Sequence, residues 1–314
     1  MENKIPWFQV LFRWHGSVIP AVLPRVCLCI GFGTVIAALE QAGWAVSWPV
    51  LGSLVPSIVL GLLLVFRTNT AYERFWEGRK LWGTLVNTTR NLARQIWVAV
   101  EETEANDRAA KIAALRLLVG FAIAMKLHLR QEPLHPELEA MMSPQQFAQL
   151  RAMNHPPLEI AFWTADYLQR CHRQGQLNPY QLSAMIDLLD KTVDVLGGCE
   201  RILKTPIPLA YSIHLKQLLM LYCLSLTFQV VGSLHWWTGG VVGLISFAVF
   251  GIEEIGIEIE NPFGHDPNDL PLDAICCTMA RNIEDLISLS PSSCQWQGPP
   301  PQPVGHVLRA RESP

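Results

Sequence analysis

Charged side chains that directly follow apolar runs are the residues of this 314-residue chain best suited to chemistry. Glu253, Glu254 and Glu258 follow one such run, and Arg67 and Arg74 follow another. Carboxylates at the mouth of a water-filled path attract cations, whereas guanidinium groups attract anions. We therefore consider both sets as vestibule charges, the alternative for the glutamates being that they are only the solvated end of a helix.

Residue patterns for catalysis and metal binding are missing from the sequence. No motif pairs a nucleophile with a general base, so we expect no enzymatic activity. His128, His172 and His214 have no histidine four residues away, and we interpret them as structural. The eight cysteines include no CxxC pair, which predicts reduced thiols and no structural zinc site. A net charge of -3 gives no basic field for nucleic acid.

Four apolar stretches predict a membrane protein. The chain is 50% hydrophobic and 16% charged, where soluble domains carry about 25% charged residues. A helix needs about 20 mostly apolar residues to cross the hydrocarbon layer. The stretches that come near this length are 18–45, 50–66, 218–234 and 238–252. The second is short, which suits a helix enclosed by others, and Pro56 is expected to kink it or break its hydrogen-bond ladder.

The distribution of basic residues predicts the orientation in the membrane. The links between spans one and two and between spans three and four contain no Lys or Arg, whereas Arg67, Arg74, Arg79 and Lys80 follow the second span. Because basic residues stay on the cytosolic side, we expect a multi-pass protein of the cell (plasma or inner) membrane with both termini in the cytosol. Tryptophans in the two links suit an interfacial belt on the outer side.

The segment between the second and third spans has the composition of a soluble helical domain. Apolar residues recur three and four residues apart after Arg67, as in an amphipathic helix that continues out of the membrane. The stretch 111–130 has the look of a span, but charged residues bracket it, and we predict a buried cytosolic helix. A loop with a short helix is expected over 131–157, followed by helices over 157–173 and 181–204.

The fold class predicted for the whole chain is all-α. No sustained alternation of apolar and polar residues, typical of strands, occurs along it. We expect an N-terminal segment with two spans, a cytosolic helical domain, two further spans, a C-terminal cytosolic segment and a disordered Pro- and Ser-rich tail. These divisions are 1–66, 67–213, 214–252, 253–288 and 289–314.

Two segments of the sequence carry a resemblance to a known family. The first is FRTNTAYERFWEGRKLWGTLVNTTRNLARQ, residues 66–95. The second is EIENPFGHDPNDLPLDAICCTMARNIEDL, residues 258–286, which contains an N-P-F-G motif. Shorter matches at 14–18 and 195–212 extend the resemblance along almost the whole chain apart from the tail. On these segments the sequence resembles the bestrophin family, in particular its bacterial and plant branch.

The resemblance implies a homopentamer in the lipid membrane, with four membrane helices per subunit and a central pore. Its narrow neck would be lined by Ile58, Leu62 and Phe66, which are spaced i, i+4, i+8 and share one helical stripe. An apolar stripe in a narrow pore can gate by dewetting, although spacing alone also fits a stripe that packs against another helix. Tyr180 matches a second constriction in the cytosolic portion.

A calcium site is a further implication of the resemblance. Asp266 and Asp269 match positions at which animal bestrophins hold calcium, and carboxylate oxygens suit that ion. The stretch HDPNDLPLD lacks a continuous acidic run and does not fit an EF-hand loop. The alternative is that these residues cap a helix that begins near Leu270. No cofactor is required by either interpretation.

The sequence thus predicts an ion channel that passes small monovalent ions passively, with chloride and other anions slightly preferred. A cation-selective channel of the same fold is the first alternative, because the glutamates after the fourth span oppose the arginines after the second. A membrane scaffold or regulatory protein that conducts nothing is the second. A secondary transporter ranks last, since Pro56 has no counterpart in the fourth span.

Overall fold

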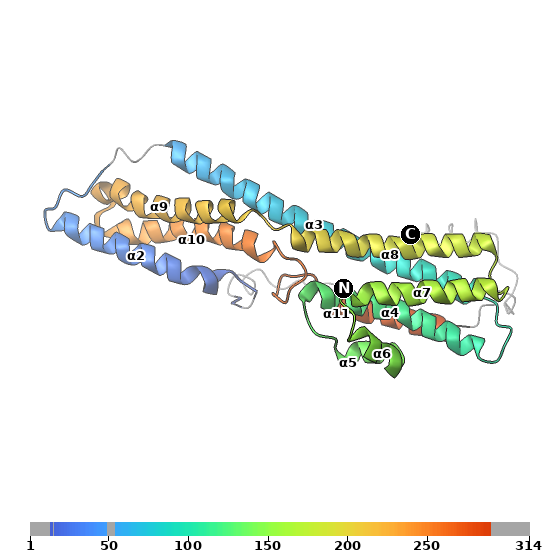
Figure 1. Cartoon of the computed structure of the whole chain (residues 1–314). Coiled ribbons are helices and arrows are strands. Elements are labelled where there is room, and N and C mark those ends of the chain that lie inside the picture. The colour runs from blue at the N-terminus through green and yellow to red at the C-terminus, as the bar shows by residue number, and fades with distance from the viewer. Residues whose placement is uncertain (1–12, 15, 49–53, 290–314) are drawn as a thin grey trace, which may run out of the picture.

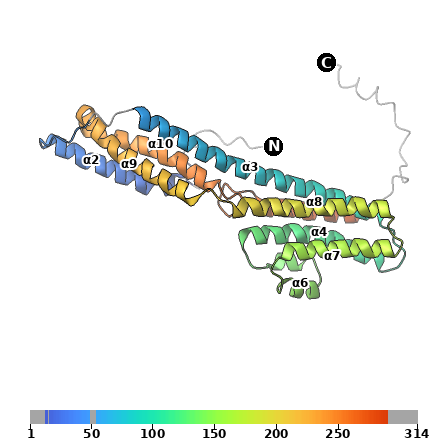
Figure 2. The same ribbon diagram turned by 45° about the horizontal axis from the view of Figure 1, so that its top comes forward.

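The computed structural model describes residues 13–14, 16–48 and 54–289, and its regular structure there consists of helices only. Figures 1 and 2 show an elongated molecule whose helices form two bundles placed end to end. Two large hydrophobic cores correspond to these bundles. The all-α prediction is therefore confirmed for the described residues.

The first bundle packs three apolar helices against the start of a fourth. It contains α2 (Ile19–Gln41), α9 (Leu209–Leu234) and α10 (Thr238–Glu258), and the 3-10 helix η2 (His235–Trp237) joins the last two. By length and composition, α2 and the stretch Leu209–Glu258 both qualify as membrane spans. The links at the far end of this bundle carry exposed tryptophans, namely Trp44, Trp48, Trp236 and Trp237. These features fit the membrane part of the protein.

Helix α3 (Leu54–Ala99) runs through both bundles as one helix of 46 residues (Figure 2). Its first part contributes Leu60 and Leu64 to the first core, and its second part contributes Trp82 and Ile96 to the second. At ~1.5 Å of rise per residue, α3 is about 69 Å long. The predicted continuation of the second span into an amphipathic helix is confirmed.

The predicted interruption at Pro56 is wrong. Pro56 is the third residue of α3 and lies in its first turn, where a backbone N–H group has no acceptor within the helix. The missing donor therefore costs no hydrogen bond, and the fixed φ of the ring suits a helix start. The part of the predicted span 50–66 that precedes Leu54 lies outside the described residues.

The second bundle buries α4 (Asp107–Arg130) among the second half of α3 and three other helices. These are α7 (Pro156–Arg173), α8 (Pro179–Lys204) and α11 (Leu272–Ser288). Helix α4 is long and apolar enough for a span, yet 78% of its apolar stretch is buried inside the protein. The prediction of a buried helix over 111–130 is therefore confirmed, because neighbouring helices rather than lipid cover its apolar faces.

The predicted single short helix over 131–157 is replaced by two. They are α5 (Pro136–Glu139) and α6 (Pro144–Leu150). A capping box starts α6, because the Ser143 side chain accepts a hydrogen bond from Gln146 N and the Gln146 side chain accepts one from Ser143 N. The predicted tail from residue 290 onward lies outside the described residues.

Helices α2 and α10 approach closely because glycines lie at their contact. A Cβ atom on Gly33 of α2 would lie 3.0 Å from the Cα atom of Gly239 in α10. A Cβ atom on Gly239 would in turn lie 2.6 Å from Thr34 Oγ1. In a bilayer, where lipid tails are as apolar as the side chains, such close packing supplies much of the attraction between helices.

Candidate functional site

The predicted neck residues share one uncovered face of α3. The side chains of Ile58, Leu62 and Phe66 are 54%, 53% and 62% exposed, whereas Leu60 and Leu64 on the opposite face are buried in the first core. No helix in the described part of this chain covers the stripe, so the alternative of packing within the chain is not met there. Lipid, a pore or another copy of the chain remains as its neighbour.

Arg67 follows the stripe directly and has an unusual environment. The residue is buried, and its Nη2 donates a hydrogen bond of 2.6 Å to Glu260 Oε2. Its Nη1 is also buried and has no hydrogen-bond partner among the described residues. Phe66 and Arg67 both line a cavity of about 370 Å³ beside the segment 205–208. A buried N–H group without an acceptor carries a desolvation cost that a small anion would relieve.

Arg74 lines the same cavity, but its guanidinium group is occupied. Its Nε donates to Glu260 O at 3.0 Å, its Nη2 donates to Ile202 O at 2.7 Å, and its Nη1 donates to Thr205 O. Arg74 therefore ties α3 to the end of α8 and to the segment after α10. Its predicted role as a vestibule charge remains a prediction, and its hydrogen bonds assign it a structural task.

The three predicted glutamates differ in their surroundings. Glu253 is buried and lies 3.4 Å from Arg25 Nη1 and 4.0 Å from Lys216 Nζ, and Glu254 lies 2.8 Å from Arg25 Nη1. Glu258 is half-buried and forms no ion pair within the described residues. Arg25 and Lys216 offset much of the negative charge that would attract cations. The glutamates' role as vestibule charges stays a prediction.

Tyr180 lies far along the molecule from the stripe. It is 87% exposed and is the second residue of α8, whose other end carries Ile202, an acceptor for Arg74. Their separation of 22 positions corresponds to about 33 Å along the helix axis. A constriction at Tyr180 and a neck at the stripe would therefore lie at separate levels of one long path. Tyr180's role stays a prediction.

Asp266 and Asp269 lie together in the loop between α10 and α11. Asp269 Oδ2 accepts a hydrogen bond of 2.8 Å from Asp266 N, while Asp269 Oδ1 is buried without a partner among the described residues. Burial, and then the charges of Asp266 and Glu258, raise the pKa of Asp269 to about 6. The pair thus suits a proton or a cation, and the calcium site remains a prediction.

The alternative that these aspartates cap a helix is wrong. Helix α11 begins at Leu272 rather than near Leu270, and Pro271 occupies its N-cap without a side-chain hydrogen bond. Asp269 Oδ2 instead accepts a hydrogen bond from Asp266 N, within the loop that precedes the helix. Asp273, in the first turn of α11, is the acidic residue that favours the positive end of the helix.

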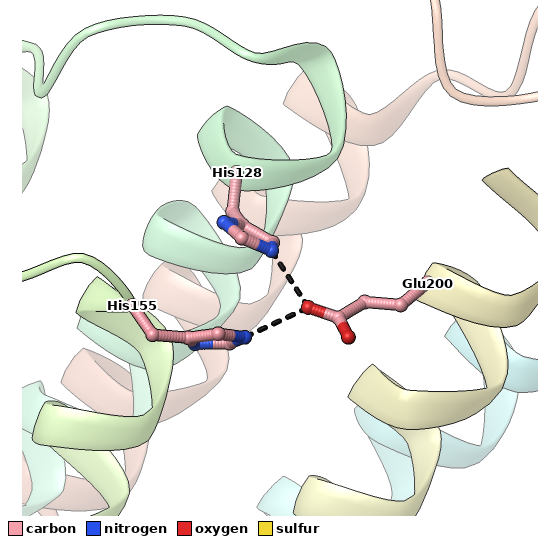
Figure 3. A group of neighbouring side chains, drawn as sticks. All are labelled: His128, His155 and Glu200. Carbon is pink, nitrogen blue, oxygen red and sulfur yellow. Dashed lines mark hydrogen bonds and ion pairs between the residues drawn. The ribbon is translucent and has the colours of Figure 1, made fainter. Parts of the chain in front are cut away.

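A cluster of His128, His155 and Glu200 was missed by sequence reasoning (Figure 3). His128 lies in the last turn of α4, His155 is the N-cap residue of α7, and Glu200 belongs to α8. The interpretation of His128 as an isolated structural histidine is therefore incomplete. No local spacing reveals the cluster, because its members come from three helices.

The comparisons with known proteins all point to one protein family. The chain matches the family model described as Bacterial/Fungal Bestrophin protein over residues 1–285. It is 64% identical over 289 residues to a voltage-dependent anion channel-forming protein of Nostoc sp., with 92% of this chain and 94% of that protein covered. A protein of the same description from Synechocystis sp. is 60% identical, with 91% and 93% covered. Among solved structures, a mutant of a bacterial bestrophin homologue from Klebsiella pneumoniae aligns with a TM-score of 0.79 at 31% identity, over 88% of this chain and 100% of that one.

Proposed function

The chain belongs to the bacterial and fungal bestrophin family, and from that premise we propose that its copies assemble into a channel through which anions cross a membrane. The relatives from Nostoc and Synechocystis carry the description of anion channels rather than of enzymes. The finer proposal is a homopentamer of the cell membrane that passes small monovalent ions, chloride among them, down their gradient. Each subunit contributes four membrane helices, and both termini face the cytosol.

The observation that carries the proposal is the uncovered apolar stripe on α3. Ile58, Leu62 and Phe66 repeat every four residues, and each is more than half exposed in the single chain. With α3 turned toward a central axis, rings of these side chains would form a narrow apolar constriction. Water leaves such a constriction readily, so an ion passes only when the ring widens.

The proposed anion preference rests on the charges beyond the stripe. Arg67 presents a buried N–H group that has no partner in the described part of the chain, beside the cavity that Phe66 lines. The nearby carboxylates Glu253 and Glu254 are paired with Arg25. Arg67 is thus paired with Glu260 through one nitrogen and keeps the other for an anion, whereas two of the three acids that would favour a cation are partly neutralised.

Reversal potential tests the sign of the permeant ion. Purified full-length protein is placed in a planar bilayer under a KCl gradient, and current is measured against voltage. We expect reversal near the chloride potential. Reversal near the potassium potential would establish the cation-selective alternative, and no current from folded, oligomeric protein would favour the scaffold.

The neck assignment is tested by Ile58→Ala. Shortening this side chain widens the apolar ring, so the current at a fixed voltage should rise. Val59→Ala is the matched control, because Val59 lies one residue along α3 and lines a groove toward α9 with Leu218 and Tyr222. An equal effect of both substitutions on the current would show that the stripe does not line the ion path.

A further inference from the structure

Two histidines converge on one carboxylate oxygen in the second bundle. His128 Nε2 and His155 Nε2 each lie 2.7 Å from Glu200 Oε1, and the two imidazole rings have centroids 4.4 Å apart. Figure 3 shows both rings pointing at the carboxylate from separate helices. All three ligand atoms lie within 4.8 Å of one another. The residues are half-buried, so water and small ions reach them.

We propose that His128, His155 and Glu200 bind one divalent transition-metal ion of the zinc type. Imidazole nitrogen and carboxylate oxygen are ligands that zinc accepts, and two histidines with one carboxylate leave a coordination position for water. The site is distinct from the stripe, the arginines and the aspartates considered above. It does not depend on the channel function.

The geometry needs only a small adjustment to receive the metal. Ligand atoms around a tetrahedral zinc ion with bonds of ~2.0 Å lie about 3.3 Å apart. The two nitrogens must therefore move away from Glu200 Oε1 by about 0.6 Å as the metal replaces the hydrogen-bonded protons. A cavity of about 440 Å³ lined by His128, Asn154 and Lys204 lies beside the cluster and gives an ion a route to it.

A lysine holds the carboxylate of the cluster in place. Lys204 Nζ lies 3.2 Å from Glu200 Oε2, so it holds the oxygen that the histidines leave free. The carboxylate is thus oriented before a metal arrives. Lys204 itself is the charge against which the metal must compete.

One ring nitrogen of the cluster has no hydrogen-bond partner in the described structure. His155 Nδ1 is buried and has no partner among the described residues. In a histidine that serves only for packing, a buried polar atom without a partner lowers the stability of the fold, and nothing offsets this loss. A bond from His155 Nε2 to a metal would supply a gain that offsets this cost.

Metal binding would fasten three helices at the end of the second bundle that meets the first. His128 lies in the last turn of α4, His155 is the N-cap residue of α7, and Glu200 lies two residues before Ile202, whose carbonyl accepts a hydrogen bond from Arg74. A bound ion would therefore stiffen the frame to which the pore helix α3 is tied. The expected consequence is a higher thermal midpoint of the second bundle.

The experiment measures zinc binding to the purified full-length protein in detergent. Metal is first removed with EDTA, and the chelator is removed before the chain is titrated with zinc by calorimetry. Metal content after desalting is measured by mass spectrometry. We expect one zinc ion per chain and a raised thermal midpoint. His128→Gln, His155→Gln and Glu200→Gln should each weaken zinc binding by about tenfold or more. Loss of a residue that only hydrogen-bonds to a metal ligand already lowers metal affinity by about tenfold or more.

His172→Gln is the matched control, because His172 is also half-buried in the second bundle but bonds Leu177 O through Nδ1. It should bind zinc as the wild type does. Gel filtration of every variant separates lost binding from lost folding. Absence of zinc from folded wild-type protein, or binding unchanged in all three variants, would overturn the proposal and leave a hydrogen-bonded cluster only.

Discussion

Asp269 shows at the scale of one residue how burial changes a common carboxyl group. Its pKa rises to about 6, chiefly through burial, from an ordinary value of 3.8. The folded chain therefore binds the proton more tightly than the unfolded chain does. The stability that Asp269 contributes is fully present below about pH 4 and is lost as pH rises through about pH 6.

Asp269→Asn should flatten this part of the pH dependence. The amide keeps an acceptor for Asp266 N but carries no charge to bury, so the thermal midpoint should fall less between pH 4 and pH 7 than in the wild type. Asp285→Asn, which changes an exposed aspartate of α11, is the control and should leave the slope unchanged. Identical slopes for wild type and Asp269→Asn would contradict the assignment. Added calcium that raises only the wild-type midpoint at pH 7 would support the predicted calcium site.

At the scale of elements, the contact between α2 and α10 is set by glycine. A Cβ atom on Gly239 would meet Thr34 Oγ1 and would lie 3.0 Å from Ile30 O, which is backbone and cannot turn away. The next residue, Gly240, has open space around the position of a Cβ atom. Two adjacent glycines of one helix thus differ only in whether another helix lies against them.

Gly239→Ala should therefore lower stability, and Gly240→Ala should not. Overpacking of this kind costs about 1 to 3 kcal/mol in the free energy of unfolding, whereas alanine in open space keeps or improves helix propensity. Thermal midpoints of the two variants in the same detergent provide the measurement. A midpoint for Gly239→Ala equal to that of Gly240→Ala would show that the two helices separate without cost.

At the scale of the whole molecule, one exposed helix face cannot enclose an ion path. The stripe of Ile58, Leu62 and Phe66 becomes a ring only when several copies of α3 surround an axis. Closed rotational symmetry gives each copy the same contact with its neighbour. The proposed channel therefore requires oligomerisation, and bestrophin resemblance sets the expected number of copies at five.

Native mass measurement in nanodiscs should give five times the chain mass of 35.2 kDa once lipid and belt protein are subtracted. The same preparation should carry the current measured in bilayers. Denatured protein serves as the single-chain reference. A monomer that still conducts would contradict the pore arrangement, because the stripe of a single chain has nothing opposite it.

Most of the fold followed from local sequence patterns. The apolar runs and the three- and four-residue spacing predicted α2, α4, α7 and α8 within a few residues, because helix formation and burial of one face depend on near neighbours. Helix α9 begins nine residues before the predicted span 218–234, and α10 ends six residues after the predicted span 238–252, because both helices continue past their most apolar stretch. Pro56 was misjudged because a proline disrupts the interior of a helix but not its first turn. The residue pattern did not show where α3 begins. The capping alternative for Asp269 failed because its side chain accepts a hydrogen bond from Asp266 N, within the loop that precedes α11.

The sequence by itself determined that this is a helical membrane protein of the bestrophin family. It also determined that the second predicted span carries an apolar stripe whose residues recur every four positions. Tertiary structure decided which charges are free. Arg67 meets Glu260, and Arg25 meets Glu253, across separations of 193 and 228 residues. His128, His155 and Glu200 meet from three helices. Hydrogen bonds and ion pairs act over a few ångströms, so these partners are set by how the helices pack and not by spacing along the chain.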